Sequence, residues 1–356
     1  MLRRRFVFLA LVSSALSASQ PLPRDKVQEI EKLVTEEMSR QGIPAISVAV
    51  ATSGELRWSS GFGLSDVENW VPAKASTVYR LGSISKPITA VAALQLVERG
   101  LLELDAPVQK YVAAFPQKQA PITTRLLLGH LAGIRHYNSE EEVNSTRHYT
   151  NQLDPLAIFA ADPLVAEPGV RFHYTTYGYV LLGAVVEAAS AVPFTEYLRE
   201  RIFQPAGMDR IQADDVYSII PNRTRGYRRY PTGQLQNCSL ADTSNKIPGG
   251  GLSSTVEDLV KFAAAVRRGA LLKPDTVETM FTHQSLRDGS ASGYGLGWGI
   301  ANLEERKMVS HTGGQQGTST MLAMLPREGV IVAVMCNLEG GNVSSLAARI
   351  AKLLLP

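Results

Sequence analysis

The sequence predicts an α+β fold, in which one antiparallel sheet is flanked by N- and C-terminal helices and carries an inserted, mainly helical lobe. Three observations predict it. Strand-like runs occur near both ends of the 356-residue chain, helical periodicity borders them, and the middle of the chain is mostly helical or loop. Strands from the two ends can then share one sheet, with a cleft for a ligand between the sheet and the inserted lobe.

The expected sheet lobe comprises residues of about 24–100 and 245–356. The opening helix carries apolar residues at helical spacing and stops at Gly42. Thr52, Ser53 and Gly54 join the first two strands as a hairpin, and Gly100 ends the next helix. The expected helices are 25–41, 84–98, 256–267 and 343–355, and the expected strands are 45–51, 55–62, 294–300, 308–311, 318–325 and 330–336.

The expected helical lobe, residues of about 101–244, is punctuated by Pro, Asn and Gly and contains one long apolar helix over 179–191. Together the two lobes are expected to form a single domain over residues 20–356. Residues 1–19 differ from this domain. An arginine triplet precedes the apolar stretch 6–16 and small residues up to Ser19, which is the pattern of a secretory signal peptide. We therefore expect a periplasmic or extracellular protein. A mitochondrial presequence is the alternative, because the first acidic residue is Asp25.

Composition excludes several classes of protein. With 45% hydrophobic and 19% charged residues, the chain can bury a large core and lacks the signature of disorder. The formal charge of +3 falls to about zero when the arginine triplet is removed, so no basic patch indicates a nucleic-acid partner. For the two cysteines, Cys238 and Cys336, free thiols and a disulfide are both open, because export permits a disulfide but the spacing does not require one.

Residues 80–90, RLGSISKPITA, place Ser83 three residues before Lys86 at the expected start of a helix. Positions three apart share a helix face, so the Lys86 amine can lie beside the Ser83 hydroxyl. A serine is a poor nucleophile until a base takes its proton, and Lys86 could be that base. Pro87 is compatible with the first helical turn. The alternative is that Ser83 only caps the helix.

Two further stretches suit the same chemistry. FHYTTYGYVLLG (172–183) places Tyr174 in a loop before an apolar helix, and HTGGQQG (311–317) places His311 at a strand edge. Over roughly residues 25–350, this order of serine, tyrosine and HTG resembles the serine β-lactamase and penicillin-binding-protein superfamily. GHLAGIRHY, IPGGGLSSTVEDL and YGLGW resemble its class C-like branch, and HLAGIRHY, YTTYGY and DTSNK are most similar to the LACTB (serine β-lactamase-like protein) subgroup.

The resemblance implies a β-lactamase/transpeptidase-like fold and a role for each matching residue. Ser83 would attack a carbonyl, with Lys86 or a Tyr174 phenolate as the base, and the pKa of that base must lie below its usual range. The backbone NH groups of Ser83 and Gly314 would form the oxyanion hole. The implied substrate-binding residues are Thr176, His311, Thr312 and Gly313.

Two positions depart from the superfamily pattern. Thr176 stands where YxN usually has an asparagine, and His311 stands where many members have the lysine of KTG. Both changes weaken the expectation of efficient penicillin hydrolysis and favour a peptidase or an esterase. Because a histidine is partly charged at neutral pH, His311 also predicts that anionic substrates bind better as the pH drops through about 6.5.

Other kinds of site are disfavoured. The six histidines include no HExxH pattern; His130 is expected to be structural and His136 to line the mouth of the cleft. No nucleophile elbow and no Gly-rich phosphate cradle occur, so we expect no metal and no cofactor. Tyr177 and Tyr179 compete with Tyr174 for its role, but they lie nearer the apolar helix and are expected to pack.

The sequence therefore predicts a cofactor-free serine hydrolase that forms an acyl-enzyme on Ser83. Its substrate would be a small molecule or a peptide with an amide, ester or lactam carbonyl. Peptide or amide hydrolysis is the leading activity, followed by carboxylester hydrolysis and weak β-lactamase activity. The alternative is structural: LACTB-type proteins are associated with filament assembly, so the chain could act chiefly as a homo-oligomer or filament.

Overall fold

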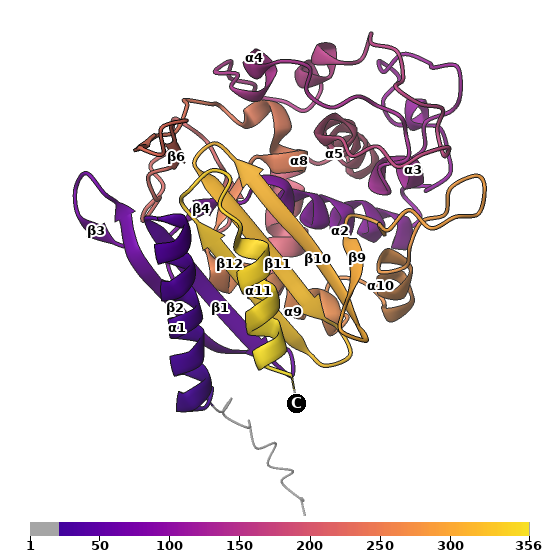
Figure 1. The fold of residues 1–356 in the computed structure, drawn as a ribbon. Helices are drawn as coiled ribbons and strands as arrows, with labels where there is room; N and C mark the ends of the chain where they lie inside the picture. The colour runs from indigo at the N-terminus through magenta and orange to yellow at the C-terminus, as the bar shows by residue number, and fades with distance from the viewer. Residues whose placement is uncertain (1–20, 356) are drawn as a thin grey trace, which may run out of the picture.

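A central antiparallel sheet organises the computed structural model, which describes residues 21–355 (Figure 1). The strand order is β3-β2-β1-β12-β11-β10-β9, so strands from both ends of the chain lie side by side. In the central pair, Ala49 of β1 lies opposite Ala333 of β12. The predicted signal peptide, residues 1–19, lies outside the described residues. The strands of this sheet are β1 (Ala45–Thr52), β2 (Glu55–Asp66), β3 (Val71–Pro72), β9 (Gly299–Leu303), β10 (Arg306–Gln315), β11 (Thr318–Leu325) and β12 (Val330–Cys336).

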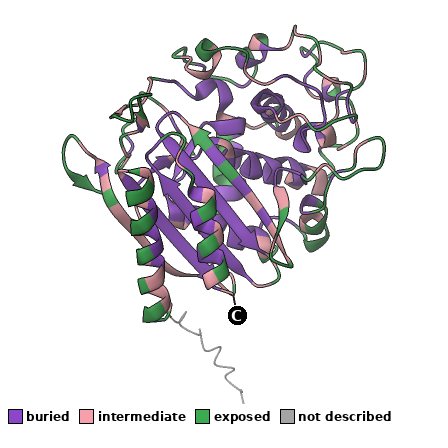
Figure 2. Cartoon of the chain, in the orientation of Figure 1, coloured by how far each residue is buried: buried purple, intermediate pink, exposed green. Residues whose placement is uncertain are grey.

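Two helices from opposite ends of the chain cover one face of the sheet. These are α1 (Arg24–Gln41) and α11 (Val343–Leu353), and they pack on each other as well as on the sheet. Each helix buries an apolar stripe and exposes a polar one (Figure 2), as with Leu346 and Ile350 of α11, which are fully buried. Amphipathic periodicity of this kind is what predicted both helices.

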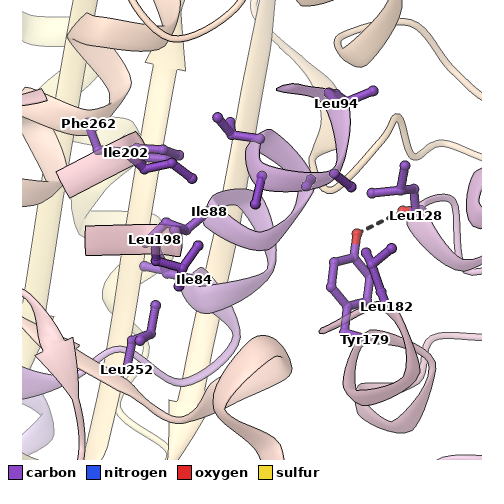
Figure 3. Close-up of a cluster of buried hydrophobic side chains, with 14 of the residues drawn as sticks. Ile84, Ile88, Leu94, Leu128, Tyr179, Leu182, Leu198, Ile202, Leu252 and Phe262 are labelled. Carbon is purple, nitrogen blue, oxygen red and sulfur yellow. Dashed lines mark hydrogen bonds between the residues drawn. The ribbon is translucent and has the colours of Figure 1, made fainter. Parts of the chain in front are cut away.

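The other face of the sheet packs against helices that belong to a second layer. Helix α9 (Val256–Arg267) packs directly on β1, β2 and β12, whereas α2 (Ser85–Glu98) lies against α5 (Thr176–Ser190) and reaches the sheet through the 3₁₀ turn that precedes it. Figure 3 shows Ile84 and Ile88 pointing toward Leu198 and Leu252, while residues of α5 lie on the opposite side of α2. There the hydroxyl of Tyr179 donates a hydrogen bond to the carbonyl of Leu128 at 2.8 Å. As a result, α2 is buried on nearly every side.

The remaining elements are mostly short; α3, α4, α8 and β6 lie in the upper part of the molecule in Figure 1, whereas α9 and α10 lie lower. The remaining elements include a three-stranded sheet of order β4-β8-β5 and a hairpin of β6 and β7. In the described part of the chain, no single helix is long and apolar enough to span a membrane, and one bent pair, Thr176–Ser190 with Phe194–Ala206, meets that test jointly. The bounds are α3 (Thr124–Leu128), α4 (Glu140–Val143), α6 (Phe194–Leu198), α7 (Gln204–Ala206), α8 (Ile247–Gly250), α9 (Val256–Arg267), α10 (Pro274–Met280), β4 (Tyr79–Arg80), β5 (Gln212–Ala213), β6 (Tyr227–Arg229), β7 (Leu235–Asn237) and β8 (Leu252–Ser254).

The predicted fold class is confirmed, and several predicted boundaries match, including those of α9, β11 and β12. The predicted strand over 294–300 is wrong, because Gly297 has a φ of +87° and turns the chain before β9 begins at Gly299. Helix α5 begins at Thr176 rather than at 179, since the hydroxyl of Thr175 accepts the backbone N–H of Gly178 as a cap. The helix α10 was not predicted.

The disulfide alternative for the two cysteines is also wrong. Cys238 and Cys336 are both free thiols. Cys336 is the last residue of β12 and is fully buried, and its thiol contacts the carbonyl of Leu338 at 3.5 Å. The Cys336 thiol therefore behaves as part of the core, and burial raises its pKa to about 11.

Candidate active site

The position of Ser83 is set by a short 3₁₀ turn, Gly82–Ile84, that leads directly into α2. Gly82 has a φ of +53°, and a Cβ on it would lie 2.8 Å from the backbone nitrogen and oxygen of Gly314. Only a glycine fits there without displacing the strand. The turn therefore packs directly on β10, which brings Ser83 to the edge of the sheet while leaving its side chain partly accessible.

Lys86 is the second residue of α2, and its side chain is fully buried. Its Nζ lies 2.9 Å from the Oγ of Ser83, 3.3 Å from the Oγ1 of Thr176 and 2.6 Å from the carbonyl oxygen of Gly249. All three of these oxygens are uncharged. Burial, together with the positive charge of Lys246, therefore holds the pKa of Lys86 well below its usual range.

Tyr174 lies in the loop before α5, where the expected third group should be. The Nζ of Lys86 is 4.8 Å from the centre of its ring, and the ring lies 4.3 Å from that of His130. Burial raises the pKa of the Tyr174 phenol, and the side chain of Ser83 opposes that rise only in part. The expectation that a phenolate pKa is lowered here is thus wrong, because the site desolvates the phenol more strongly than any nearby charge favours the anion.

The two competing tyrosines have other partners. The hydroxyl of Tyr177 donates to a carboxylate oxygen of Glu142 at 2.9 Å, and the hydroxyl of Tyr179 donates to Leu128 as described above. Both side chains are fully buried in the packed interior of α5. The structure therefore brings Tyr174, and neither of these two residues, beside Ser83 and Lys86.

The edge of β10 next to Ser83 is only half paired. β9 pairs with β10 over Arg306–Ser310, whereas His311–Gln315 pair with β11 alone. Along this segment the burial alternates, with Thr312 and Gly314 exposed and His311 and Gly313 buried. A Cβ on Gly313 would lie 2.0 Å from the carbonyl oxygen of Leu81, so the strand also packs closely against the chain just before Ser83.

The side chain of His311 points into the protein and is only 6% exposed. Its Nδ1 is 2.6 Å from the carbonyl oxygen of Thr312, which can only accept, so Nδ1 carries the proton. Nε2 then accepts from the hydroxyl of Tyr294 at 2.8 Å. Burial and the nearby Lys86 lower the pKa of His311 to about 3. The prediction of a partly charged imidazole that attracts anionic substrates is therefore wrong.

Ser83, Thr176 and Gly314 open into one cavity of about 290 Å³. His136 lines the same cavity, as expected, whereas His311, Thr312 and Gly313 do not. A larger cavity of about 520 Å³ lies beyond Gln316 and contains none of the predicted site residues. The other residues of the smaller cavity are Tyr137, Val143, Gly249, Gly250, Gln315, Gln316, Thr318, Glu339 and Gly340.

Two histidines hold the start of α5 in place. Nδ1 of His130 accepts the backbone N–H of Thr175, and Nδ1 of His136 accepts that of Thr176, both at 3.2 Å. Burial lowers the pKa of His130 well below its usual range and that of His136 to about 4, so both rings are neutral. His130 is fully buried in the position where a structural role was expected. Among residues 21–355, no group of three His, Cys, Asp or Glu side chains could hold a metal ion.

Sequence reasoning assigned no role to Lys246. Its Nζ lies 3.2 Å from the carbonyl oxygen of Val143 and 5.1 Å from the centre of the Tyr137 ring, directly behind the cavity wall. Burial and the charge of Arg80 lower the pKa of Lys246 to about 8. Its signal in the sequence is a lysine placed immediately before the apolar, Gly-rich stretch IPGGG. The contact with Gly249 has no signal in the sequence, because it is made by a backbone carbonyl, which every residue has.

Comparisons with known proteins agree with this geometry. A family model described as Beta-lactamase matches residues 30–355. The serine beta-lactamase-like protein LACTB, mitochondrial, of Homo sapiens is 31% identical, over 87% of this chain and 76% of that protein. Penicillin-binding protein 4* of Bacillus subtilis (strain 168) is 29% identical, over 78% of this chain and 64% of that protein.

A solved structure extends the likeness to three dimensions. The octameric penicillin-binding protein homologue from Pyrococcus abyssi superposes with a TM-score of 0.79 at 30% identity, over 92% of this chain and 77% of that one. The resemblance predicted from the sequence motifs is thus confirmed. The chain belongs to the beta-lactamase family, and within it to the serine β-lactamase-like hydrolases that include LACTB and penicillin-binding proteins.

Proposed function

We propose that this protein hydrolyses amide bonds through an acyl-enzyme on Ser83, with Lys86 as the base that activates the serine. The observation that carries the proposal is the set of three oxygen contacts around the buried Lys86 amine. An amine without a carboxylate partner in a dry site favours its neutral form. Only that form can accept a proton from Ser83.

The hydrogen-bonding capacity of a neutral amine fits these contacts. It has two N–H donors and one lone pair. The carbonyl of Gly249 can only accept, so it takes one N–H, and the hydroxyl of Thr176 can take the other. The lone pair is then left for the hydroxyl of Ser83, at 2.9 Å. This assignment gives the Thr that replaces the usual Asn a positioning role.

The proposed reaction has an acylation and a deacylation stage, and Lys86 accepts and then returns one proton in each. Lys86 takes the Ser83 proton as Oγ bonds to the substrate carbonyl carbon, and the N–H groups of Ser83 and Gly314 stabilise the resulting oxyanion. Tyr174, held as a neutral phenol, then protonates the leaving nitrogen as the C–N bond breaks, and the Lys86 ammonium restores the phenol proton. Water afterwards attacks the acyl group, giving its proton to Lys86, and the acid product leaves as Ser83 regains a proton.

Amides are favoured over esters by the protonated state of Tyr174. An amine is a poor leaving group unless it is protonated as it departs, whereas an activated alcohol leaves without help. The cavity of about 290 Å³ suits one or two amino-acid residues around the scissile carbonyl. Carboxylester and weak β-lactam hydrolysis remain secondary activities of the same acyl-enzyme.

Active-site labelling tests the nucleophile. A fluorophosphonate should add one phosphonyl group to the wild-type protein, and peptide mass spectrometry should find it on Ser83. Ser83→Ala should abolish both labelling and turnover of an amino-acid p-nitroanilide. The matched control is Ser345→Ala on the exposed surface of α11, which should behave like the wild type. Labelling of Ser83→Ala at the wild-type rate would overturn the proposal.

A second proposed function is structural assembly, as a homo-oligomer or filament. It is supported by the octameric state of the penicillin-binding protein homologue from Pyrococcus abyssi and by large apolar side chains that are exposed here, such as Trp70, Tyr217 and Ile219. Light scattering and negative-stain images of the wild type and Ser83→Ala should show the same assembly in both. A monomer at all concentrations would remove this alternative.

Export is the proposed destination, with the mitochondrion as the alternative. The first rests on the N-terminal pattern of residues 1–19, and the second on the mammalian LACTB relatives, whose names place them in mitochondria. N-terminal sequencing of the mature protein separates removal after Ser17, Ala18 or Ser19 from retention of the segment.

A further inference from the structure

We infer that Glu339 selects substrates whose acyl part carries a free α-amino group, so that this hydrolase acts on aminoacyl or short peptidyl amides with an unblocked N-terminus. The inference rests on the proposed function, because it names the substrate class of the same cavity.

Among the described residues that line the cavity of about 290 Å³, Glu339 is the one with an ionic side chain. Within residues 21–355, no lysine or arginine belongs to that lining, and the His136 ring is neutral because its pKa is lowered to about 4. The two nearby lysines lie behind the wall: Lys86 is fully buried, and Lys246 donates to the carbonyl of Val143. The cavity thus presents an accessible carboxylate, which favours a cationic group over an anionic one.

Two hydrogen bonds, one to its backbone and one to its carboxylate, hold Glu339 at the cavity. The N–H of Glu339 donates to the carbonyl of Tyr227 at 2.8 Å, and Oε2 accepts the N–H of Gly317 at 3.4 Å. Arg80, which lines the neighbouring cavity, pairs with Asp214 at 2.7 Å. Glu339 is therefore fixed beside the turn that follows β10, with its charge available to a ligand.

A second group on this wall is also an acceptor. The Nε2 of Gln316 donates to the carbonyl of Val143 and to Oδ1 of Asn144, both at 2.8 Å, which fixes the orientation of the amide. Its Oε1 is buried and accepts no hydrogen bond from any described residue. The amide oxygen of Gln316 is thus buried without a partner, and the carboxylate of Glu339 is the exposed acceptor of this wall, to which an ammonium group, with three donors and no acceptor, is the complementary ligand.

The size of the cavity places this ammonium on the substrate's acyl part. The space admits only one or two residues around the carbonyl that Ser83 attacks. In so short a substrate, the amino group that can reach Glu339 is the α-amine of the first residue. Because Glu339 is exposed, solvent weakens the attraction. We therefore expect the carboxylate to change selectivity by about five- to tenfold rather than by orders of magnitude.

The test compares matched chromogenic substrates: alanyl and alanyl-alanyl p-nitroanilides, in both enantiomeric series, each with a free or an acetylated α-amine. The wild type should favour the free amine, measured as a ratio of kcat/KM values. Glu339→Gln should lower that ratio by about five- to tenfold, and Glu339→Lys should lower it further. Glu29→Gln, which removes a partly exposed carboxylate of α1, is the matched control and should leave the ratio unchanged. Raising the ionic strength should also reduce the wild-type ratio.

Each outcome decides the inference. A wild-type ratio near one, or a ratio that Glu339→Gln does not change, overturns the role of Glu339 while leaving the acyl-enzyme intact. A preference that depends on Glu339 but is seen only with acetyl-lysyl p-nitroanilide overturns the α-amino assignment. No turnover of any of these substrates, together with no fluorophosphonate label on Ser83, overturns both this inference and the proposed function.

Discussion

Helices α2 and α11 lie on opposite faces of the same sheet and differ in what they bury. α11 buries an apolar stripe, with Leu346 and Ile350 at its centre, and leaves its polar side in water. α2 is covered on nearly every side and buries Lys86 and Thr89 among apolar neighbours. A helix that is covered on nearly every side can therefore lower the pKa of a buried amine, whereas a surface helix contributes mainly to stability.

The largest expected effect comes from removing the buried amine. Lys86→Met should lower kcat/KM by roughly 10³-fold or more, because the variant lacks the base that lies beside Ser83. It should also raise the melting temperature. At neutral pH the Lys86 amine is charged in the unfolded chain, because its ordinary pKa lies well above 7. Folding must therefore either release that proton or bury the charge, and both cost free energy. Methionine removes this cost.

The matched control for this variant lies on the other helix. Lys352→Met, on the exposed side of α11, should change neither kcat/KM nor the melting temperature appreciably. Thermal scans and steady-state kinetics on both proteins make the comparison. A lower melting temperature for Lys86→Met would mean that the buried amine stabilises the fold, contrary to the comparison of the two helices.

The next largest effect is expected from a substitution in the apolar stripe of α11. Leu346→Ala should lower the free energy of unfolding by about 2–5 kcal/mol, since it leaves a cavity between α11 and the sheet. Activity per folded molecule should stay at the wild-type value. Urea titration measures the first quantity, and active-site titration measures the second. A fall in kcat for the folded variant would show that the two faces of the sheet are coupled.

Tyr174→Phe tests whether the phenol supplies a proton to the leaving group. Amide hydrolysis should fall by roughly 10²-fold, because an amine cannot leave unprotonated. Hydrolysis of a p-nitrophenyl ester should fall much less, since p-nitrophenolate leaves without a proton. Equal losses for the two substrates would instead indicate that Tyr174 takes the proton of Ser83.

The smallest expected effect is on the pH profile. Lys86 accepts a proton only when neutral, so kcat/KM should rise about tenfold per pH unit up to the lowered pKa of Lys86 and then level off. Lys246→Met removes a positive charge that helps to lower that pKa, so it should shift the rising limb to higher pH, by less than about one unit. An unchanged limb in this variant would show that burial alone sets the pKa.

Elements with a strong local pattern could be predicted from the sequence. The apolar runs of β11 and β12 bounded by turn residues predicted where both strands begin and end, and helical spacing placed Ser83 beside Lys86. The same patterns failed where a single backbone conformation decides the structure, as at Gly297 before β9.

The electrostatics of the site depend on tertiary packing and could not be read from local pattern. The neutral state of His311 follows from its burial against Tyr294, and the contact between Lys86 and Gly249 joins positions 163 residues apart. The cavity wall at Val143 and Glu339 comes from the end of the four-residue helix α4 and from the loop between β12 and α11, which are too short to carry a periodic signal.

The two ends of the described chain meet at one place, where Nζ of Lys26 donates to the carbonyl of Leu353 at 2.7 Å. The helix α11 starts at Val343, three residues after the cavity-lining Gly340, and ends at Leu353. Its 11 residues span about 16 Å, so the chain ends lie one helix length from the cavity. An affinity tag or a surface linker attached after Leu355 should therefore leave the reactive serine uncovered, which makes immobilised enzyme a practical format for substrate profiling.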